Sequence, residues 1–166
     1  GFATSFLWED VLQKDSIMDL VQNYVNVQID KETYWDIKTK SLKEKKSERL
    51  IFPRYHQRRA IQKIVTNLRK EGVGHKYLIQ HSAGSGKSNT ISWLAHRLSD
   101  FYQTAQDETA LFNSVIVVTD RRVLNRQIQN NIRQFEQTPG AVDYIDEKKS
   151  AIDLKKSIEK GTRIIV

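Results

Sequence analysis

The 166-residue sequence contains no cysteine, which excludes disulfide bonds and every metal site built on thiolate ligands. Its four histidines show no paired metal-ligand spacing. No apolar run approaches the ~20 residues that a membrane-spanning helix needs. The amino end has no basic region followed by a long apolar stretch, so no secretory signal is visible. We therefore expect a soluble, cytoplasmic protein.

Acidic residues are the minority among the charged side chains. The 27 lysines and arginines against 20 aspartates and glutamates give a formal net charge of +7. This excess favours a polyanionic partner such as a nucleic acid, although many basic proteins have none. The length is sufficient for one domain with a real core.

The most informative run is glycine-rich and covers residues 83–88, Ala-Gly-Ser-Gly-Lys-Ser. Before it, residues 76–80 form a short apolar run of strand type, and after it residues 89–98 carry apolar side chains at helical spacing. Strand, glycine turn and helix in this order are the context of a phosphate-binding P-loop. The glycines let backbone N–H groups surround a phosphate, and the helix amino end adds its dipole.

Two side chains of this run carry the predicted chemistry of ATP and Mg²⁺. We expect Lys87 to contact the β- and γ-phosphates and Ser88 to contact Mg²⁺, and we name both as catalytic residues. The general P-loop pattern has a glycine where this chain has His81, and the alternative is a helix cap with a solvated lysine. The predicted nucleotide-binding residues are Arg54, Gln57, Ala83, Gly84, Ser85, Gly86, Lys87, Ser88 and Asn89.

A second motif, Phe-Pro-Arg-Tyr-His-Gln at residues 52–57, lies at the start of a predicted helix. The amide of Gln57 offers a donor and an acceptor, which matches the N6 and N7 edge of adenine. Phe52 and Tyr55 are suited to stack on the base, and Arg54 to stack or to pair with phosphate. The alternative is ordinary packing and surface exposure at a helix start.

A third motif, residues 119–122, follows an apolar run. The carboxyl ends of parallel strands form the ligand face of a sheet, so we expect Thr119, Arg121 and Arg122 beside the P-loop, in contact with nucleic-acid phosphates. The alternative is a solvated helix start. For Asp120 we favour a role as amino-terminal cap of the next helix.

The pattern of strands alternating with helices predicts an α/β fold with a parallel sheet. Residues 1–49 are expected to form an adjoining, mainly helical linker segment, and residues 50–166 the start of the sheet domain. In the first segment we predict a helix over 6–24 broken at Asp15-Ser16, a strand over 25–29, and a basic surface loop or hairpin over 38–49. In the second we predict helices over 55–70 and 123–135, a turn over 71–74, a central strand over 114–119 and a strand over 163–166.

In this order the motifs resemble the first, RecA-like motor domain of superfamily 2 helicases and translocases. A closer resemblance is to the restriction (R) subunit of type I restriction–modification enzymes, whose version of the P-loop is similar to the one that contains His81. The residues that carry this resemblance are 4–12, 52–57, 81–90 and 118–122.

The resemblance implies ATP-driven translocation along double-stranded DNA, with cleavage by a nuclease domain of the same subunit. It also implies modification and specificity subunits as partners. The family layout places the nuclease before residue 1, and the Asp-x-Lys run at residues 36–38 has no matching carboxylate cluster that would give it a metal role.

ATP hydrolysis also needs an acidic motif that holds Mg²⁺ and arginines from a second motor domain. Asp146-Glu147 is followed by two lysines and favours a surface loop. We therefore expect a fragment of a longer subunit that binds nucleotide weakly and turns over no ATP. Another superfamily 2 motor and a nucleic-acid-binding module with a non-hydrolysing P-loop remain alternatives. A small-molecule kinase is disfavoured, because such enzymes place the P-loop near the chain start.

Overall fold

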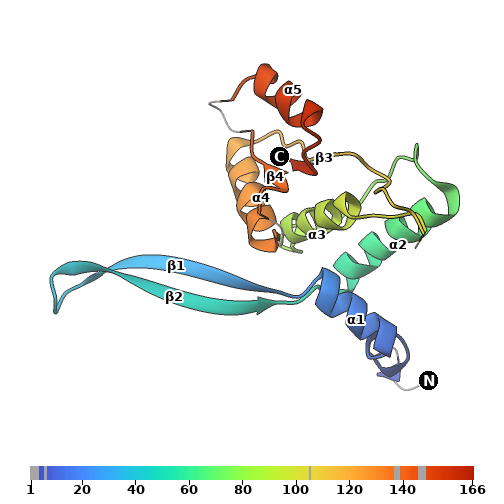
Figure 1. The fold of residues 1–166 in the computed structure, drawn as a ribbon. Coiled ribbons are helices and arrows are strands. Elements are labelled where there is room, and N and C mark those ends of the chain that lie inside the picture. The colour runs from blue at the N-terminus through green and yellow to red at the C-terminus, as the bar shows by residue number, and fades with distance from the viewer. Residues whose placement is uncertain (1–3, 6, 105, 137–138, 146–148) are drawn as a thin grey trace. The chain divides into compact units, whose positions relative to one another are not determined.

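The computed structural model describes residues 4–5, 7–104, 106–136, 139–145 and 149–166. The chain divides into two compact units, Gly1–Pro53 and Arg54–Val166 (Figure 1). Among the described residues, no helix combines the length and the apolar character needed to cross a membrane. The roles predicted for residues 1–49, as a linker segment, and for residues 50–166, as the start of a motor domain, stay predictions.

The first unit begins with helical turns. A π-helical turn, η1 (Leu7–Val11), precedes helix α1 (Lys14–Asn23). The predicted helix is therefore present in two pieces, but the prediction of a break at Asp15-Ser16 is wrong. The break lies at Gln13, whose extended backbone caps α1, and Asp15 sits in the first helical turn, where the helix dipole favours a negative charge.

The rest of the first unit is an antiparallel hairpin of β1 (Asn26–Asp36) and β2 (Ser41–Ile51), drawn as a long twisted ribbon in Figure 1. Its turn is set by Asp36, whose carboxylate accepts the backbone N–H groups of Lys38 at 2.9 Å and Thr39 at 3.4 Å. The hairpin prediction is confirmed, and the first strand is longer than predicted. The prediction of a mainly helical segment is wrong, because β1 and β2 together cover more residues than η1 and α1.

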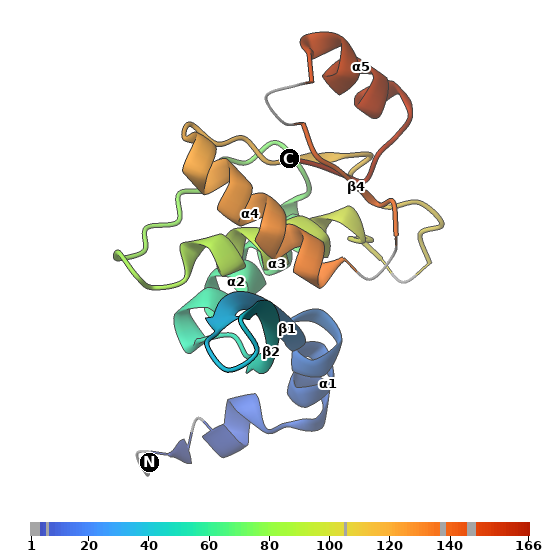
Figure 2. The same cartoon turned by 90° about the vertical axis from the view of Figure 1, so that its left-hand side faces the viewer.

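The second unit is a mixed α/β structure with a small parallel sheet (Figure 2). Its described strands lie in the order β3-β5-β4, so the predicted α/β class with a parallel sheet is confirmed. The strands are β3 (Val115–Ile116), β4 (Val142–Asp143) and β5 (Ile164–Ile165), and the helices are α2 (Tyr55–Glu71), α3 (Lys87–Ser99), α4 (Arg122–Phe135) and α5 (Ala151–Glu159).

The core of this unit lies where α3 and α4 pack against the sheet. Burial is nearly complete for Ile128 and Ile132 of α4 and for Ile164 of β5. The strand predicted at 163–166 is confirmed as the central strand, paired on both sides. The buried cluster consists of Ala95, Ile128, Ile132, Val142, Ile164 and Val166.

Two strand predictions are wrong. Residues 76–80 have no regular secondary structure, and Leu78 is 94% exposed. The strand predicted at 114–119 is only β3, and it lies at the edge of the described sheet, with Val118 87% exposed. An apolar run gives a segment strand propensity, but a strand also needs a partner, and no described strand pairs with residues 76–80.

Two elements of the second unit have no counterpart in the sequence prediction. Strand β4 is two residues long, too short for periodicity to reveal. Helix α5 has a recognisable start signal, since Asp153 accepts hydrogen bonds from the backbone N–H of Ser150 at 2.8 Å and from its hydroxyl at 3.0 Å. The side chain of Ser157 in α5 donates to Asp143 of β4, which ties these two elements together.

The pH dependence of stability tests the packing of α3 against α4. His96 of α3 forms a 3.0 Å hydrogen bond with the carbonyl oxygen of Ile132, and burial lowers the pKa of this histidine below its usual 6.5. A lowered folded-state pKa means that the unfolded chain takes up the proton first as pH falls. We expect the melting temperature to fall between pH 7.5 and 5.5, and less so in His96→Gln. The exposed His75→Gln is the control, and an equal pH dependence in all three proteins would contradict this account.

Candidate nucleotide-binding site

The glycine loop (residues 81–88) leads directly into the amino end of α3. Gly84 and Gly86 have positive φ angles of 71° and 84°, a region that residues with a Cβ rarely adopt. Gly86 is the amino-terminal cap of α3. The first backbone N–H groups of a helix have no partner within it, so this turn places donors at the end of the loop.

The loop is closed by its own hydrogen bonds. The carbonyl oxygen of Ser82 accepts from the hydroxyl of Ser85 at 2.7 Å and from Nζ of Lys87 at 2.8 Å. The same ammonium group reaches the carbonyl oxygen of His81 at 3.3 Å. Lys87 is exposed, and Ser88 follows it in the first turn of α3. The positive charge and the hydroxyl group are therefore both carried by the amino end of α3.

The first turn of α2 contacts the same loop. The side-chain amide of Gln57 donates to the carbonyl oxygen of Gly86 at 2.8 Å, while its oxygen accepts from the backbone N–H of Arg54, also at 2.8 Å. Gln57 is only 3% exposed. Nε2 of His56 lies 3.1 Å from the carbonyl oxygen of Ser85. Adenine recognition by Gln57 stays a prediction. It would require the amide to break its hydrogen bonds with the Arg54 N–H and the Gly86 carbonyl oxygen.

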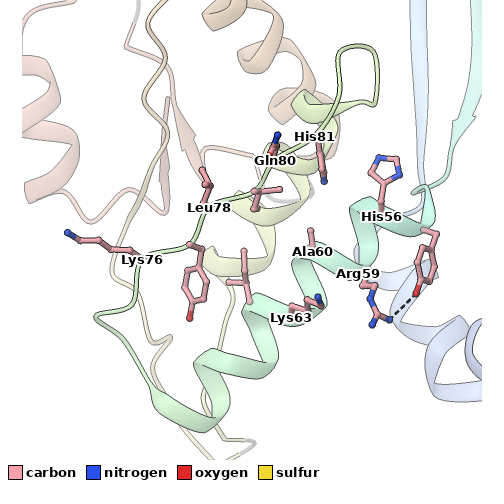
Figure 3. A pocket seen from close by; sticks show the side chains of 12 residues that line it. His56, Arg59, Ala60, Lys63, Lys76, Leu78, Gln80 and His81 are labelled. Carbon is pink, nitrogen blue, oxygen red and sulfur yellow. Dashed lines mark hydrogen bonds between the residues drawn. The ribbon is translucent and has the colours of Figure 1, made fainter.

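A pocket of about 480 Å³ lies beside this contact, between α2 and the segment that precedes the glycine loop (Figure 3). His56 and His81 line it at the loop, with their rings edge to face and 4.9 Å apart between centroids. Tyr55 also lines it, and its hydroxyl accepts a 2.9 Å hydrogen bond from Arg59. The basic residues of the lining are Arg59, Lys63 and Lys76.

The other predicted nucleotide residues lie around the loop or at the end of α2. Arg54 is exposed at the amino end of α2, and Ala83 is exposed in the loop. The side chain of Asn89, in the first turn of α3, accepts a 2.9 Å hydrogen bond from Asn131 of α4. Phe52, a predicted stacking residue, belongs to the first unit.

The predicted DNA-binding residues lie in the segment after β3 and at the first residue of α4. The prediction that Asp120 caps α4 is wrong, because Arg121 is the cap residue, and its side chain makes no capping hydrogen bond. Asp120 instead pairs with Arg121, with 3.7 Å between Oδ2 and Nε, and both side chains are highly exposed. Asp120 precedes the cap position by one residue. Its carboxylate therefore faces the guanidinium of Arg121 and not the free backbone N–H groups of the first turn of α4. Thr119 is half-buried and Arg122 begins α4.

The packing of α4 on α3 relates this segment to the glycine loop. Asn131 contacts Asn89, and Phe135 lies 5.5 Å from Trp93 between ring centroids, so the two helices run in the same general direction. Their amino ends are consequently at the same side of the unit, as Figure 2 shows. The glycine loop and the start of α4 therefore share one side.

The acidic pair Asp146-Glu147 lies outside the described residues. Among the residues that the structure describes, no group of three histidine or carboxylate side chains is placed to hold a metal ion.

A pair of alanine substitutions tests the contact between Gln57 and the loop. A Cβ on Gly86 would lie 2.5 Å from Nε2 of Gln57, whereas a Cβ on Gly84 has no atom within 4 Å. Both changes add backbone strain of about 1 kcal/mol, but only Gly86→Ala also displaces a buried hydrogen bond, worth about 1 kcal/mol. In denaturant titrations we expect Gly86→Ala to lose about 1 kcal/mol more stability than Gly84→Ala. Equal losses would show that Gln57 does not hold the loop.

The second unit thus combines a parallel α/β sheet with a glycine loop at a helix amino end. The sequence profile of the SWI2/SNF2 ATPases matches residues 56–166, from the first turn of α2 to the last residue of the chain. The chain belongs to the SWI2/SNF2 ATPase family, whose members are helicase-like ATPases. The chain matches no curated protein and no solved structure. Family membership supports ATP-dependent, helicase-like activity on nucleic acid, and the match does not specify a type I R subunit.

Proposed function

We propose that the chain is the ATP- and DNA-binding part of the R subunit of a type I restriction enzyme, an ATP-dependent DNA translocase and endonuclease as a full-length subunit. The observation that carries the nucleotide part is the glycine loop, which presents Lys87 and Ser88 from the first turn of α3. The family match to a helicase-like ATPase supports the same activity class.

In this proposal the triphosphate lies against the amino end of α3. Lys87 exchanges the carbonyl oxygens of His81 and Ser82 for the β- and γ-phosphates, which are stronger partners because they carry charge. Backbone N–H groups of the loop bind the remaining phosphate oxygens. The Ser88 hydroxyl would contact the Mg²⁺ that accompanies ATP, and the ion would offset part of the phosphate charge.

The duplex backbone is assigned to Thr119, Arg121 and Arg122. Their position at the amino end of α4, on the same side of the unit as the loop, supports this assignment. Contacts to phosphate position a protein on DNA without reading its sequence, so specificity is left to a separate subunit.

DNA binding is tested by removing two positive charges. We expect the double variant Arg121→Ala, Arg122→Ala to bind a 30-base-pair duplex about tenfold more weakly at low salt, with a shallower salt dependence, since each lost phosphate contact reduces that slope by about one. The charge-matched control is Lys155→Ala, Lys160→Ala in and beside α5. Equal losses in the two double variants, measured by fluorescence anisotropy, would indicate that only net charge matters.

The restriction assignment itself rests on the resemblance in residues 4–12, 52–57, 81–90 and 118–122. A different superfamily 2 motor is the alternative. The parent open reading frame separates them: a nuclease motif upstream, with a second motor domain downstream, supports the R subunit. An unrelated domain upstream would leave only the helicase-like ATPase family.

We also propose that the chain by itself binds nucleotide without hydrolysing it. Turnover requires an acidic Mg²⁺-binding motif and arginines from a second motor domain. We expect no release of inorganic phosphate above background from ATP, with or without duplex DNA. DNA-stimulated phosphate release that disappears in Lys87→Ala would contradict this proposal.

A further inference from the structure

We infer that His56 and Gln57 are positioning residues that fix the direction of the glycine loop's N–H groups. This inference rests on the proposed binding of ATP by that loop. It gives Gln57 a role other than contact with the adenine base, and it assigns a role to His56, for which the sequence pattern predicts none.

The two residues are neighbours in the first turn of α2, and they reach two neighbouring carbonyl groups. His56 bonds the carbonyl oxygen of Ser85 at 3.1 Å, and Gln57 donates to the carbonyl oxygen of Gly86 at 2.8 Å. Both accepting groups belong to the last turn of the loop before α3. Two consecutive peptide groups are therefore held from the same side.

Holding a carbonyl group also orients an N–H group. In a trans peptide the C=O of one residue and the N–H of the next point in opposite directions from one rigid plane. The structure has no cis peptide among its described residues. With the Ser85 and Gly86 carbonyls directed at α2, the N–H groups of Gly86 and Lys87 are directed away from it. These are donors at the amino end of a helix, where an anion binds.

The side chain of Gln57 is itself held in one orientation. Gln57 is buried, and its oxygen accepts from the backbone N–H of Arg54, so rotating the amide by half a turn would lose both of its bonds. The Gly86 oxygen also accepts the N–H of Thr90 at 3.2 Å, the first bond of α3. The Gln57 bond therefore joins the loop to the helix start as well as to α2.

His56 connects the two ends of the loop. Its ring meets that of His81 edge to face, at 4.9 Å between centroids, while its Nε2 reaches Ser85. Figure 3 shows His56 and His81 directed toward one another from α2 and from the segment before the loop. A glycine at position 81, as in the general pattern, would offer no such contact. The substitution that departs from the pattern thus supplies a partner for His56.

Base recognition and loop positioning predict different ligand dependence. If Gln57 contacts adenine, its substitution weakens the binding of ATP and leaves the binding of GTP and tripolyphosphate unchanged. If Gln57 positions the loop, its substitution weakens the binding of all three ligands alike, because all three contain the phosphate chain. Tripolyphosphate is the critical probe, since it has no base.

Two substitutions at Gln57 separate the Gly86 bond from other effects. Gln57→Glu keeps an oxygen for the Arg54 N–H but removes the donor to Gly86 and adds a charge. Gln57→Met removes the donor and adds no charge, but it loses the Arg54 bond. Only the loss of the Gly86 bond is common to both. We expect each variant to bind ATP, GTP and tripolyphosphate about tenfold more weakly in the presence of Mg²⁺ by isothermal titration calorimetry. Gln127→Glu, at an exposed position of α4, should bind as the unsubstituted chain does.

A spectroscopic readout shows the effect on the loop without ligand. In ¹⁵N-labelled full chain we expect the amide signals of Gly86 and Lys87 to shift in Gln57→Glu and in His56→Phe, which keeps a ring against His81 but loses the bond to Ser85. His56→Phe should weaken tripolyphosphate binding about threefold.

The outcomes are distinct. Equal weakening of all three ligands, together with shifted loop amides, supports the inference. If the unsubstituted chain binds ATP but the Gln57 variants lose ATP affinity alone, or none at all, the positioning role is overturned while the proposed function stands. If the unsubstituted chain binds neither ATP nor tripolyphosphate, the proposed function fails and the inference fails with it.

Discussion

Replacing Lys87 by alanine is expected to weaken binding of a non-hydrolysable ATP analogue by about 30-fold or more. Nζ of Lys87 lies at the mouth of the glycine loop, held by the carbonyl oxygens of Ser82 and His81, and it is the cation placed to meet the phosphates. Charge-assisted hydrogen bonds contribute about 1.5–3 kcal/mol each, and the proposed contact to the β- and γ-phosphates includes at least one. Isothermal titration calorimetry of the full chain measures the loss directly.

The control for this prediction removes a lysine far from the loop in sequence. Lys160 is exposed at the carboxyl end of α5, and Lys160→Ala should leave the affinity for the analogue unchanged. Because Lys87 is exposed, Lys87→Ala should also unfold within about 0.5 kcal/mol of the unsubstituted chain. An unchanged affinity in Lys87→Ala would favour the alternative of a glycine-rich helix cap with a solvated lysine.

Replacing Ile132 by alanine is expected to lower the free energy of unfolding by about 3–4 kcal/mol. Ile132 is 0% exposed and lies in the cluster that joins α4 to the sheet. Its loss removes buried methyl groups and leaves a cavity, and both terms act in the same direction. Since a domain of this kind is stabilised by only about 5–15 kcal/mol, the variant should unfold at a much lower denaturant concentration.

The matched comparison is the same substitution at a solvent-exposed site. Ile152 of α5 is 65% exposed, and Ile152→Ala should change stability by no more than about 0.5 kcal/mol. Circular dichroism during urea titration reports both variants. Similar losses at the two sites would mean that the described core is not the one that stabilises the chain.

The helices of the second unit were more predictable than its strands. Helical spacing is a local property, and α2, α3 and α4 lie within a few residues of their predicted ranges. A strand depends on which other segment pairs with it. Residues 76–80 pair with no described strand, and only Val115–Ile116 of the run 114–119 forms a paired strand. The two-residue strand β4 carries no periodicity, so only the structure reveals it.

The candidate site shows the same division between local and non-local information. The glycine loop and the helix after it follow from the order of residue types along 83–98, and the structure places them together. The contact of His56 and Gln57 with the loop joins positions 29 residues apart and leaves no pattern in the sequence. Residue type alone predicts Asp120 as the cap, but α4 begins one position later than that role requires.

The resemblance and the family match agree on a helicase-like ATPase and differ in how finely they assign it. The match covers the second unit from His56 onward and supports the motor class. The R-subunit proposal draws in addition on residues 4–12 and 52–55, which the match does not cover. The presence of a nuclease domain and the partnership with modification and specificity subunits therefore remain part of the proposal that the chain belongs to a type I R subunit.

The most direct test of the central claim is a titration of the ¹⁵N-labelled chain with a non-hydrolysable ATP analogue and Mg²⁺, followed by amide chemical shifts. Binding in the glycine loop predicts saturable shifts that are largest at Gly84, Ser85, Gly86, Lys87 and Ser88, and that vanish in Lys87→Ala. No saturable shift, or shifts centred on α5 and unaffected by Lys87→Ala, would contradict the assignment of this loop as the site of nucleotide binding.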